Sequence, residues 1–253
     1  MRINNNIMAM NTHRQLGANS LNSSKSMEKL SSGLRINRAA DDAAGLSISE
    51  KMRGQIRGLG QAQRNAQDGI SLVQTFEGAL NEVSDMLGRM KELAVQNLNG
   101  TYEGNDKANI LLEATALASA ANNIFTNTKF NGVDMTTGAT IAMGQDGGDA
   151  LVIAGISAPV IGAADLVATI DANIGAVNTI RATYGADQNR LEHMYNNMSA
   201  TRENLTASES RIRDVDMADE MMKFTKNNIL QQAAQAMLAQ ANQAPQGVLQ
   251  LLR

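Results

Sequence analysis

The sequence lacks cysteine and tryptophan altogether, and only two of its 253 residues are proline. The absence of cysteine excludes a disulfide framework, a thiolate nucleophile and a cysteine-ligated zinc site. Proline is the residue that most strongly ends a helix, and only Pro159 and Pro245 interrupt the chain in this way. The sequence therefore permits very long helices.

Aromatic side chains are also scarce, at 3% of the residues, although 43% of the residues are hydrophobic. The hydrophobic share excludes a wholly disordered chain. Because aromatic residues usually supply the largest buried areas, burial must come instead from many contacts between Leu, Ile, Met, Val and Ala. Long packed helices fit this composition better than a compact enzyme does.

Long apolar runs are missing too, so we expect no membrane insertion, and the N-terminus lacks the apolar stretch of a secretory signal peptide. The net charge of −3 gives no reason to expect a nucleic-acid partner. The charges are nevertheless uneven, because residues 1–38 carry six Lys or Arg and one acid, whereas residues 39–212 carry twelve and twenty. This asymmetry indicates either an electrostatic contact between parts of the chain or a solvated basic arm.

Residues that commonly carry chemistry are few. His13 and His193 are the only histidines, and His193 lacks the second histidine of an H-E-x-x-H zinc site. The loop GQDGGD at 144–149 lacks the lysine of a phosphate-binding loop and the acid pattern of a calcium-binding loop, whereas a hairpin turn explains its composition. We therefore predict that the protein is not an enzyme and has no catalytic, cofactor-binding or metal-binding residues.

Apolar residues recur at steps of three and four along most of the chain. They predict one long helix from Met52 to Ala94, a second helix from about Asn105, and a third long helix from about Asp165. A stretch rich in Gly, Thr and β-branched residues, about 132–164, predicts a small β-hairpin with strands over 139–143 and 150–153. The fold class is thus mainly α, with long antiparallel helices in a coiled-coil-like bundle and one small β-hairpin region.

The two ends of the chain differ from this bundle. The first segment is polar and rich in Ser and Asn, and its few apolar residues on one helical face include Leu16, Met27 and Leu30. The last segment carries apolar residues on several faces, namely Ile229, Leu230, Ala233, Met237 and Leu238. Since neither helix can bury its surface alone, we predict that these residues make self-assembly contacts and become ordered on assembly. A head-to-tail contact that does not close builds an open helical filament.

Several long blocks of this sequence resemble bacterial flagellins. MRINNNIMAMNTHRQL, KLSSGLRINRAADDAAGLSISEKMRGQIRGL, DGISLVQTFEGALNEVSDMLGRMKELAVQNLNGTY and TKFNG are similar to the N-terminal half of that family. RIRDVDMADEMMKFTKNNILQQAAQAMLAQANQAPQGVLQLLR is similar to its C-terminal signature. The blocks stand in the family's order at both ends of the chain.

The resemblance implies a subunit of the bacterial flagellar filament, which serves motility. Residues 1–38 and 213–253 would pair as terminal helices in an inner-core domain, and residues 39–212 would form an outer-core helical domain. The stretch between the two halves is too short for a large outer variable domain. The implied partners are other copies of the chain, an export chaperone, the type III export apparatus, and the filament cap and hook-junction proteins. The implied location is secreted, in the extracellular flagellum.

The resemblance also implies recognition by the Toll-like receptor for flagellin, through a helical patch whose matching positions are Arg89, Leu93, Gln96 and Glu113. Gly88 stands where such flagellins commonly have Gln. For Leu93, ordinary helix packing is the alternative interpretation.

Other classes of protein share some of these features. A coiled-coil signalling or adaptor protein would also have heptads and no active site, but it would not explain the apolar C-terminal helix beside a basic N-terminal segment. A membrane-surface protein would carry Lys- and Arg-rich polar faces, whereas residues 39–212 are acidic. An enzyme would need an inserted zinc protease, whose motif is missing. Filament formation by concentrated protein separates these alternatives.

Overall fold

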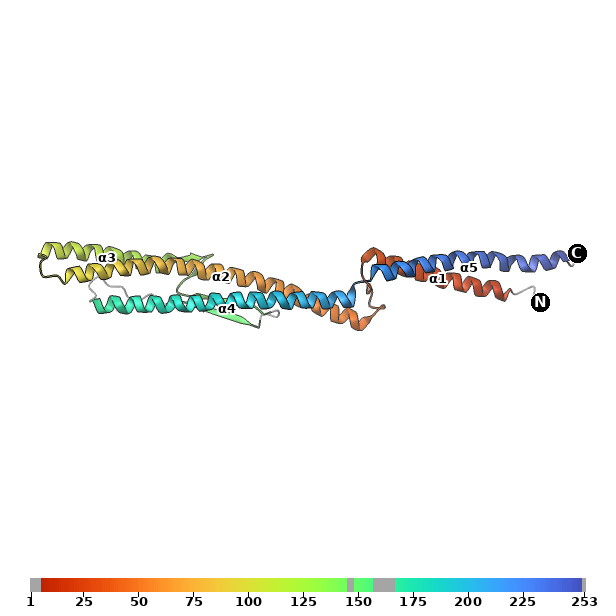
Figure 1. Cartoon of the computed structure of the whole chain (residues 1–253), viewed down its shortest axis with the longest axis horizontal. Helices are drawn as coiled ribbons and strands as arrows, with labels where there is room; N and C mark the ends of the chain where they lie inside the picture. Colours follow the sequence, from red (N-terminus) through yellow and green to blue (C-terminus); the bar gives the residue numbers. More distant parts are fainter. Residues whose placement is uncertain (1–5, 145–147, 157–166, 252–253) are drawn as a thin grey trace. The chain divides into compact units, whose positions relative to one another are not determined.

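The computed structural model describes residues 6–144, 148–156 and 167–251, with side chains described as far as Gln243. Most of this part is helical, and the clustering of contacts divides the chain into two compact units, Met1–Arg53 with Leu205–Arg253, and Gly54–Asn204. The helices, shown in Figure 1, are α1 (Ile7–Ser32), α2 (Ala43–Asn97), α3 (Gly104–Asn127), α4 (Val167–Arg213) and α5 (Met217–Leu251). The mainly α fold expected from the sequence is confirmed.

The long helix predicted from Met52 begins earlier, since α2 starts at Ala43 and runs for 55 residues. Its start is set by Asp42, whose Oδ1 accepts a hydrogen bond from the backbone N–H of Gly45 at 2.8 Å. The helix therefore begins at a polar cap residue and not at an apolar residue of the seam. The apolar pattern alone therefore placed the start about two turns too late.

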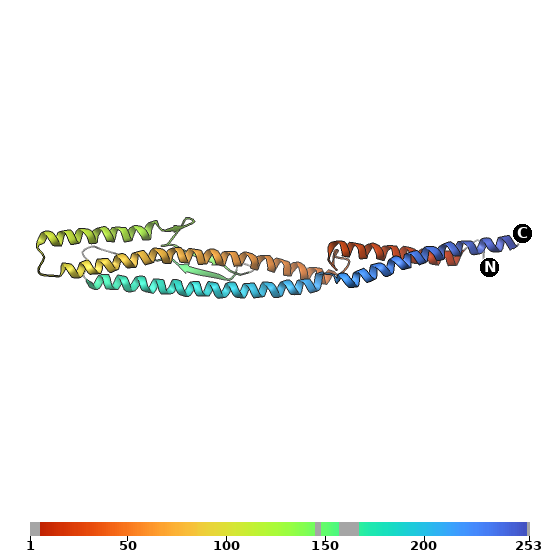
Figure 2. The same ribbon diagram turned by 45° about the horizontal axis from the view of Figure 1, so that its top comes forward.

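The core of the Gly54–Asn204 unit forms where α2 runs beside α3 and α4 (Figure 2). On α2 the seam keeps the 4-3-4-3 spacing of a coiled coil, and its fully buried members include Phe76, Leu80, Val83, Leu87 and Met90. On α4 every seventh residue is buried, namely Ile170, Val177, Tyr184, Leu191 and Met198. On α3 the buried side chains are Ala114, Ala118, Ala121 and Phe125. This unit thus has an apolar core of its own.

The predicted hairpin is present as β3 (Gly138–Ala142) and β4 (Ala150–Ala154), which pair antiparallel with Thr140 opposite Val152. Leu151 and Ile153 on one face of β4 are buried, and their neighbours are exposed. The hairpin contacts α2 at Gly69, where an added Cβ would lie 3.2 Å from the Ile141 side chain. The remainder of the expected region, from 157 onward, lies outside the described residues.

A second, smaller hairpin was not predicted. β1 (Lys129–Phe130) pairs with β2 (Val133–Asp134) across a two-residue turn. The turn residues Asn131 and Gly132 both have positive φ, 48° and 84°, which is the backbone of a type I′ turn. Asn-Gly is the sequence signal for this turn, but strands of two residues are too short to show an alternating pattern.

Tyr184 supplies a test of this core. Its ring lies 6.2 Å from that of Phe76, its hydroxyl donates to the carbonyl of Ala154 at 3.4 Å, and burial raises the pKa of the phenol from 10.0 to about 12. Since the folded pKa lies above the unfolded one, the contribution of this group to stability is complete below about pH 10 and falls as the pH rises towards 12.

We expect Tyr184→Phe to lose less stability than the parent chain between about pH 10 and 12. The measurement is thermal unfolding across that range, with Tyr195→Phe on the same helix as the matched control. An alkaline loss in Tyr184→Phe as steep as in the parent would contradict the assignment.

Candidate assembly surface

The terminal helices α1 and α5 lie side by side in the unit that contains both chain ends (Figures 1 and 2). Asn6 caps α1, because its Oδ1 accepts from the backbone N–H of Ala9 at 3.1 Å. The same side chain donates from Nδ2 to the carbonyl of Ala241 at 2.7 Å. One asparagine thus caps the first helix and joins it to the far part of the last one.

The opposite end of the pair is fixed by backbone hydrogen bonds. Gly33 ends α1 in the left-handed conformation, with φ 72°, and its N–H donates to the carbonyl of Lys29 at 2.8 Å. The next residues form a short antiparallel bridge, in which Arg35 N–H donates to Arg213 at 2.6 Å and Val215 N–H donates to Gly33 at 3.0 Å. Asp216 then caps α5 by accepting from the backbone N–H of Ala218 at 3.0 Å.

Two ion pairs lie at this end of the terminal helices. Arg213 lies 2.6 Å from Glu50, and this hydrogen bond lowers the pKa of the carboxyl. On α5, Lys223 lies 2.6 Å from Asp219, and this contact raises the pKa of the ammonium. The Arg213 side chain is only 14% exposed, whereas Glu50, Asp219 and Lys223 are about half exposed, so solvent screens their charges.

The fully buried residues at the contact between α1 and α5 are polar. The buried residues of α1 are Asn19, Ser23 and Ser26, and the Ser23 hydroxyl donates to Asn228 Oδ1 of α5 at 3.1 Å. Among residues 217–243 of α5, only Glu220 is buried. No large apolar side chain of either helix is buried within these described ranges. Leu16 and Leu30 of α1 and Phe224 and Leu238 of α5 are half-buried. The pair therefore combines hydrogen bonds with partly covered apolar side chains and has no fully buried apolar core within these ranges.

Most other large apolar side chains of the two helices are exposed. Of the predicted assembly residues, Ile229, Leu230, Ala233, Met237 and Met27 are exposed, whereas Leu16, Leu30 and Leu238 are half-buried. The side chain of Ile229 is 60% exposed and that of Leu230 is 40% exposed. Further exposed apolar residues on the two helices are Ile7, Met8, Met10, Leu21 and Met217, together with Met221 and Met222, whose sequence pattern allows either an intermolecular groove or core packing. Five of these seven are methionines in the first turns of α1 or α5, where an apolar periodicity is not yet established.

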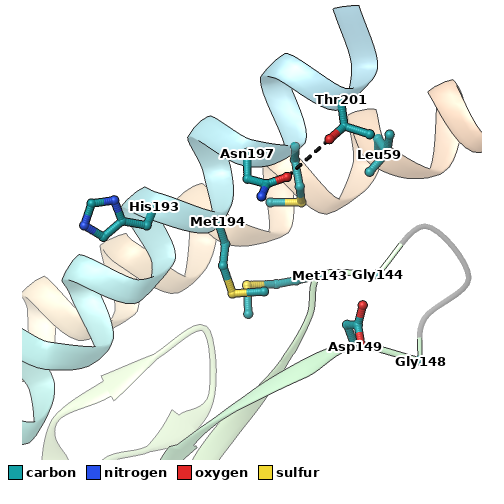
Figure 3. Close-up of a pocket in the computed structure, with 10 residues that line it drawn as sticks. Leu59, Met143, Gly144, Gly148, Asp149, His193, Met194, Asn197 and Thr201 are labelled. Atoms are coloured by element: carbon teal, nitrogen blue, oxygen red, sulfur yellow. Dashed lines mark hydrogen bonds between the residues drawn. The ribbon is translucent and has the colours of Figure 1, made fainter. Parts of the chain in front are cut away.

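A separate hollow lies within the Gly54–Asn204 unit, between α4 and the tip of the β3–β4 hairpin (Figure 3). It contains His193 and Asp149, but Figure 3 shows them at opposite ends of the hollow, so they form no acid–base pair. Met143 and Met194 occupy the space between, and Thr201 donates to Asn197 at 3.2 Å. The described residues contain no group of His, Asp or Glu that could hold a metal ion. His13 is exposed on α1.

The predicted receptor patch lies on α2 and α3. Arg89 donates to Glu92 at 2.9 Å and to Glu113 at 3.0 Å, and both contacts raise the pKa of the guanidinium. Gln96 is exposed and donates to the Tyr102 hydroxyl at 3.2 Å. Leu93 is only 2% exposed, so its side chain belongs to the core of the unit.

Within the described residues, no helix has both the length and the apolar character needed to cross a membrane.

Comparisons with known families and sequences find matches to both halves of the chain. The model of the bacterial flagellin N-terminal helical region matches residues 3–140, and that of the bacterial flagellin C-terminal helical region matches residues 167–252. The flagellin of Halalkalibacterium halodurans is 52% identical over 272 residues and that of Bacillus subtilis is 50% identical over 304 residues. The flagellar filament 33 kDa core protein of Treponema phagedenis is 44% identical over 286 residues.

In each of these three comparisons the match covers 100% of this chain and 100% of the relative. Only residues 141–166 separate the two matched regions, so this is a short form with no large domain between them. With both terminal regions matched and relatives of about half identity across its length, the chain belongs to the bacterial flagellin family.

Proposed function

We propose that the outward apolar faces of α1 and α5 are the contacts through which copies of this chain build a filament. As a flagellin, the chain is a structural subunit of the bacterial flagellar filament, it polymerises with itself, and the filament serves motility. The observation that carries the proposal is the contact between α1 and α5, whose buried residues on α1 are polar and which leaves most large apolar residues of both helices exposed.

Magnitudes favour apolar burial over charge as the source of assembly energy. Covering one exposed Leu or Ile stabilises a contact by roughly 1.5–3 kcal/mol, whereas an exposed ion pair contributes about 0–1 kcal/mol. The burial of several such side chains per subunit therefore contributes more free energy to assembly than ion pairs made by the basic residues of 1–38. That basic segment is better suited to setting the register between subunits.

The same reasoning supports an inner and an outer layer. Residues 1–38 and 213–253 would form the inner core, because helices with apolar residues on several sides need neighbours on several sides. Residues 39–212 would form the outer core, since most of this segment lies in the unit with its own buried seam. Such a unit can face solvent without a partner.

Further partners follow from the state of the subunit before and after assembly. Exposed apolar helices in a free subunit need cover, which fits an export chaperone and secretion through the type III export apparatus. A polymer whose interfaces do not close has two unlike ends, which fits a cap protein at one end and hook-junction proteins at the other.

Recognition by the host Toll-like receptor for flagellin is a second proposal, supported by the exposed charges on α2 and α3. Arg89, Gln96 and Glu113 are available to a partner. Leu93 would act by holding α2 in place, because its side chain is buried.

The assembly proposal predicts that Leu230→Asp abolishes filaments. Since Leu230 is 40% exposed, the substitution removes about 1 kcal/mol of intersubunit apolar burial per subunit, and it adds an unpaired carboxylate to the interface, which is the larger cost. Sedimentation measures the polymer, and circular dichroism with thermal unfolding monitors the Gly54–Asn204 unit, whose transition should be unchanged.

Leu230→Met is the matched control, because a swap of similar volume usually costs less than about 1.5 kcal/mol. It should polymerise. Normal filaments from Leu230→Asp would place the inner contact elsewhere, and loss of the thermal transition would make this segment part of an intramolecular core.

The receptor proposal predicts that Arg89→Ala reduces signalling by the free subunit in receptor-reporter cells. Arg64→Ala removes an exposed arginine from the same helix, outside the patch, and should signal like the parent. Unchanged signalling by Arg89→Ala would refute the patch. Leu93→Ala is not used for this test because truncating a buried Leu costs about 2–5 kcal/mol of stability.

A further inference from the structure

The methionines of this chain divide between two environments. Of the 15, only Met1 lies outside the described residues. Met90, Met135, Met143 and Met198 are buried in the Gly54–Asn204 unit, at 6% exposure or less. By contrast, α1 exposes Met8, Met10 and Met27, and α5 exposes Met217, Met221, Met222 and Met237, all between 48% and 71%. Every largely exposed methionine among the described residues is therefore on α1 or α5.

This placement has a packing reason and a chemical consequence. The unbranched thioether adapts to irregular partner surfaces, so methionine suits a face that is covered on assembly. In the free subunit, however, the same sulfur atoms are open to solvent. Oxidation to the sulfoxide converts a flexible apolar side chain into a polar one and disrupts methionine-rich interfaces.

We propose that the exposed methionines of α1 and α5 make the free subunit sensitive to hydroperoxides, which oxidise them and thereby stop it from polymerising. The inference rests on the assembly role proposed above. In the reaction with hydrogen peroxide, a sulfur lone pair attacks one peroxide oxygen, an S–O bond forms and the O–O bond breaks. Sulfur is oxidised by two electrons, and the peroxide is reduced to water.

Met221 and Met222 are the positions where the effect is expected to be strongest. They line one shallow hollow of α5 together with Ile229 and Leu230, two of the predicted assembly residues. A sulfoxide oxygen there is carried into an apolar contact, where a polar group without a partner is costly. The surface that drives assembly and the surface open to oxidation are thus the same.

The experiment treats the full-length free subunit with hydrogen peroxide and follows two quantities. Peptide mass spectrometry should find sulfoxide at the α1 and α5 methionines about tenfold or more ahead of the four buried ones. Seeded elongation, measured by sedimentation, should fall by about tenfold or more. Methionine sulfoxide reductases for both epimers should then restore elongation.

A control variant carries Met52→Leu, Met86→Leu and Met194→Leu, the three half-buried methionines. It should remain as sensitive to peroxide as the parent. Met221→Leu with Met222→Leu should bring the ratio of treated to untreated elongation rates closer to one. If this variant does not elongate untreated, the reductase reversal decides.

The results that would contradict the oxidation proposal differ from those that would contradict the proposed function. Unchanged elongation of a subunit whose α5 methionines are fully oxidised, failure of the reductases to restore it, or resistance of the control variant overturns this proposal alone. Failure of the untreated parent chain to polymerise overturns the proposed function, and this proposal with it.

Discussion

The hydrogen-bonded contact between α1 and α5 determines how the rest of this protein behaves. Asn19, Ser23 and Ser26 are buried, and the Ser23 hydroxyl donates to Asn228, so polar contacts align the two helices. The large apolar residues of both helices stay exposed or half-buried within the described ranges. A net hydrogen bond contributes only about 0.5–1.5 kcal/mol, which is little against the cost of ordering two long helices. These hydrogen bonds by themselves therefore supply little of the stability of the pair.

The Gly54–Asn204 unit, in contrast, has a fully buried apolar core. Its α2 seam and the regularly spaced residues of α4 bury aliphatic and aromatic side chains, and the β3–β4 hairpin closes against α2 at Gly69. This unit needs no partner to hide its apolar surface. One unit thus buries its apolar surface by itself, and the other leaves apolar side chains exposed. This division suits a subunit that is free before assembly and functions in a polymer.

The sequence predicted the helices and the main hairpin because their signals are local and repeated. Heptad spacing located α2 and α4, and Gln145 to Gly148 marked the turn between β3 and β4. The apolar pattern placed the start of α2 too late, whereas the acidic pair Asp41 and Asp42 carries the signal for a helix N-terminus, and Asp42 forms the cap. The β1–β2 hairpin was missed because its strands are too short for a pattern, although Asn131-Gly132 carried the signal.

The candidate surface could be predicted only in part. Ile229, Leu230 and Met237 stood out because α5 is apolar on several sides, and these side chains are exposed. The polar face of α1 could not be foreseen as the buried one, because which face a helix presents depends on its partner and not on its own periodicity. Helix α1 has no repeat of buried apolar residues like the seventh-residue repeat of α4.

The most direct test of the central claim is amide hydrogen exchange on the free subunit and on sedimented polymer of the same chain. The account predicts weak protection of α1 and α5 in the free subunit, strong protection of the buried segments of α2 and α4, and a large gain in protection for α1 and α5 in the polymer. Strong protection of both terminal helices in a verified free subunit, with no gain on polymerisation, would contradict it.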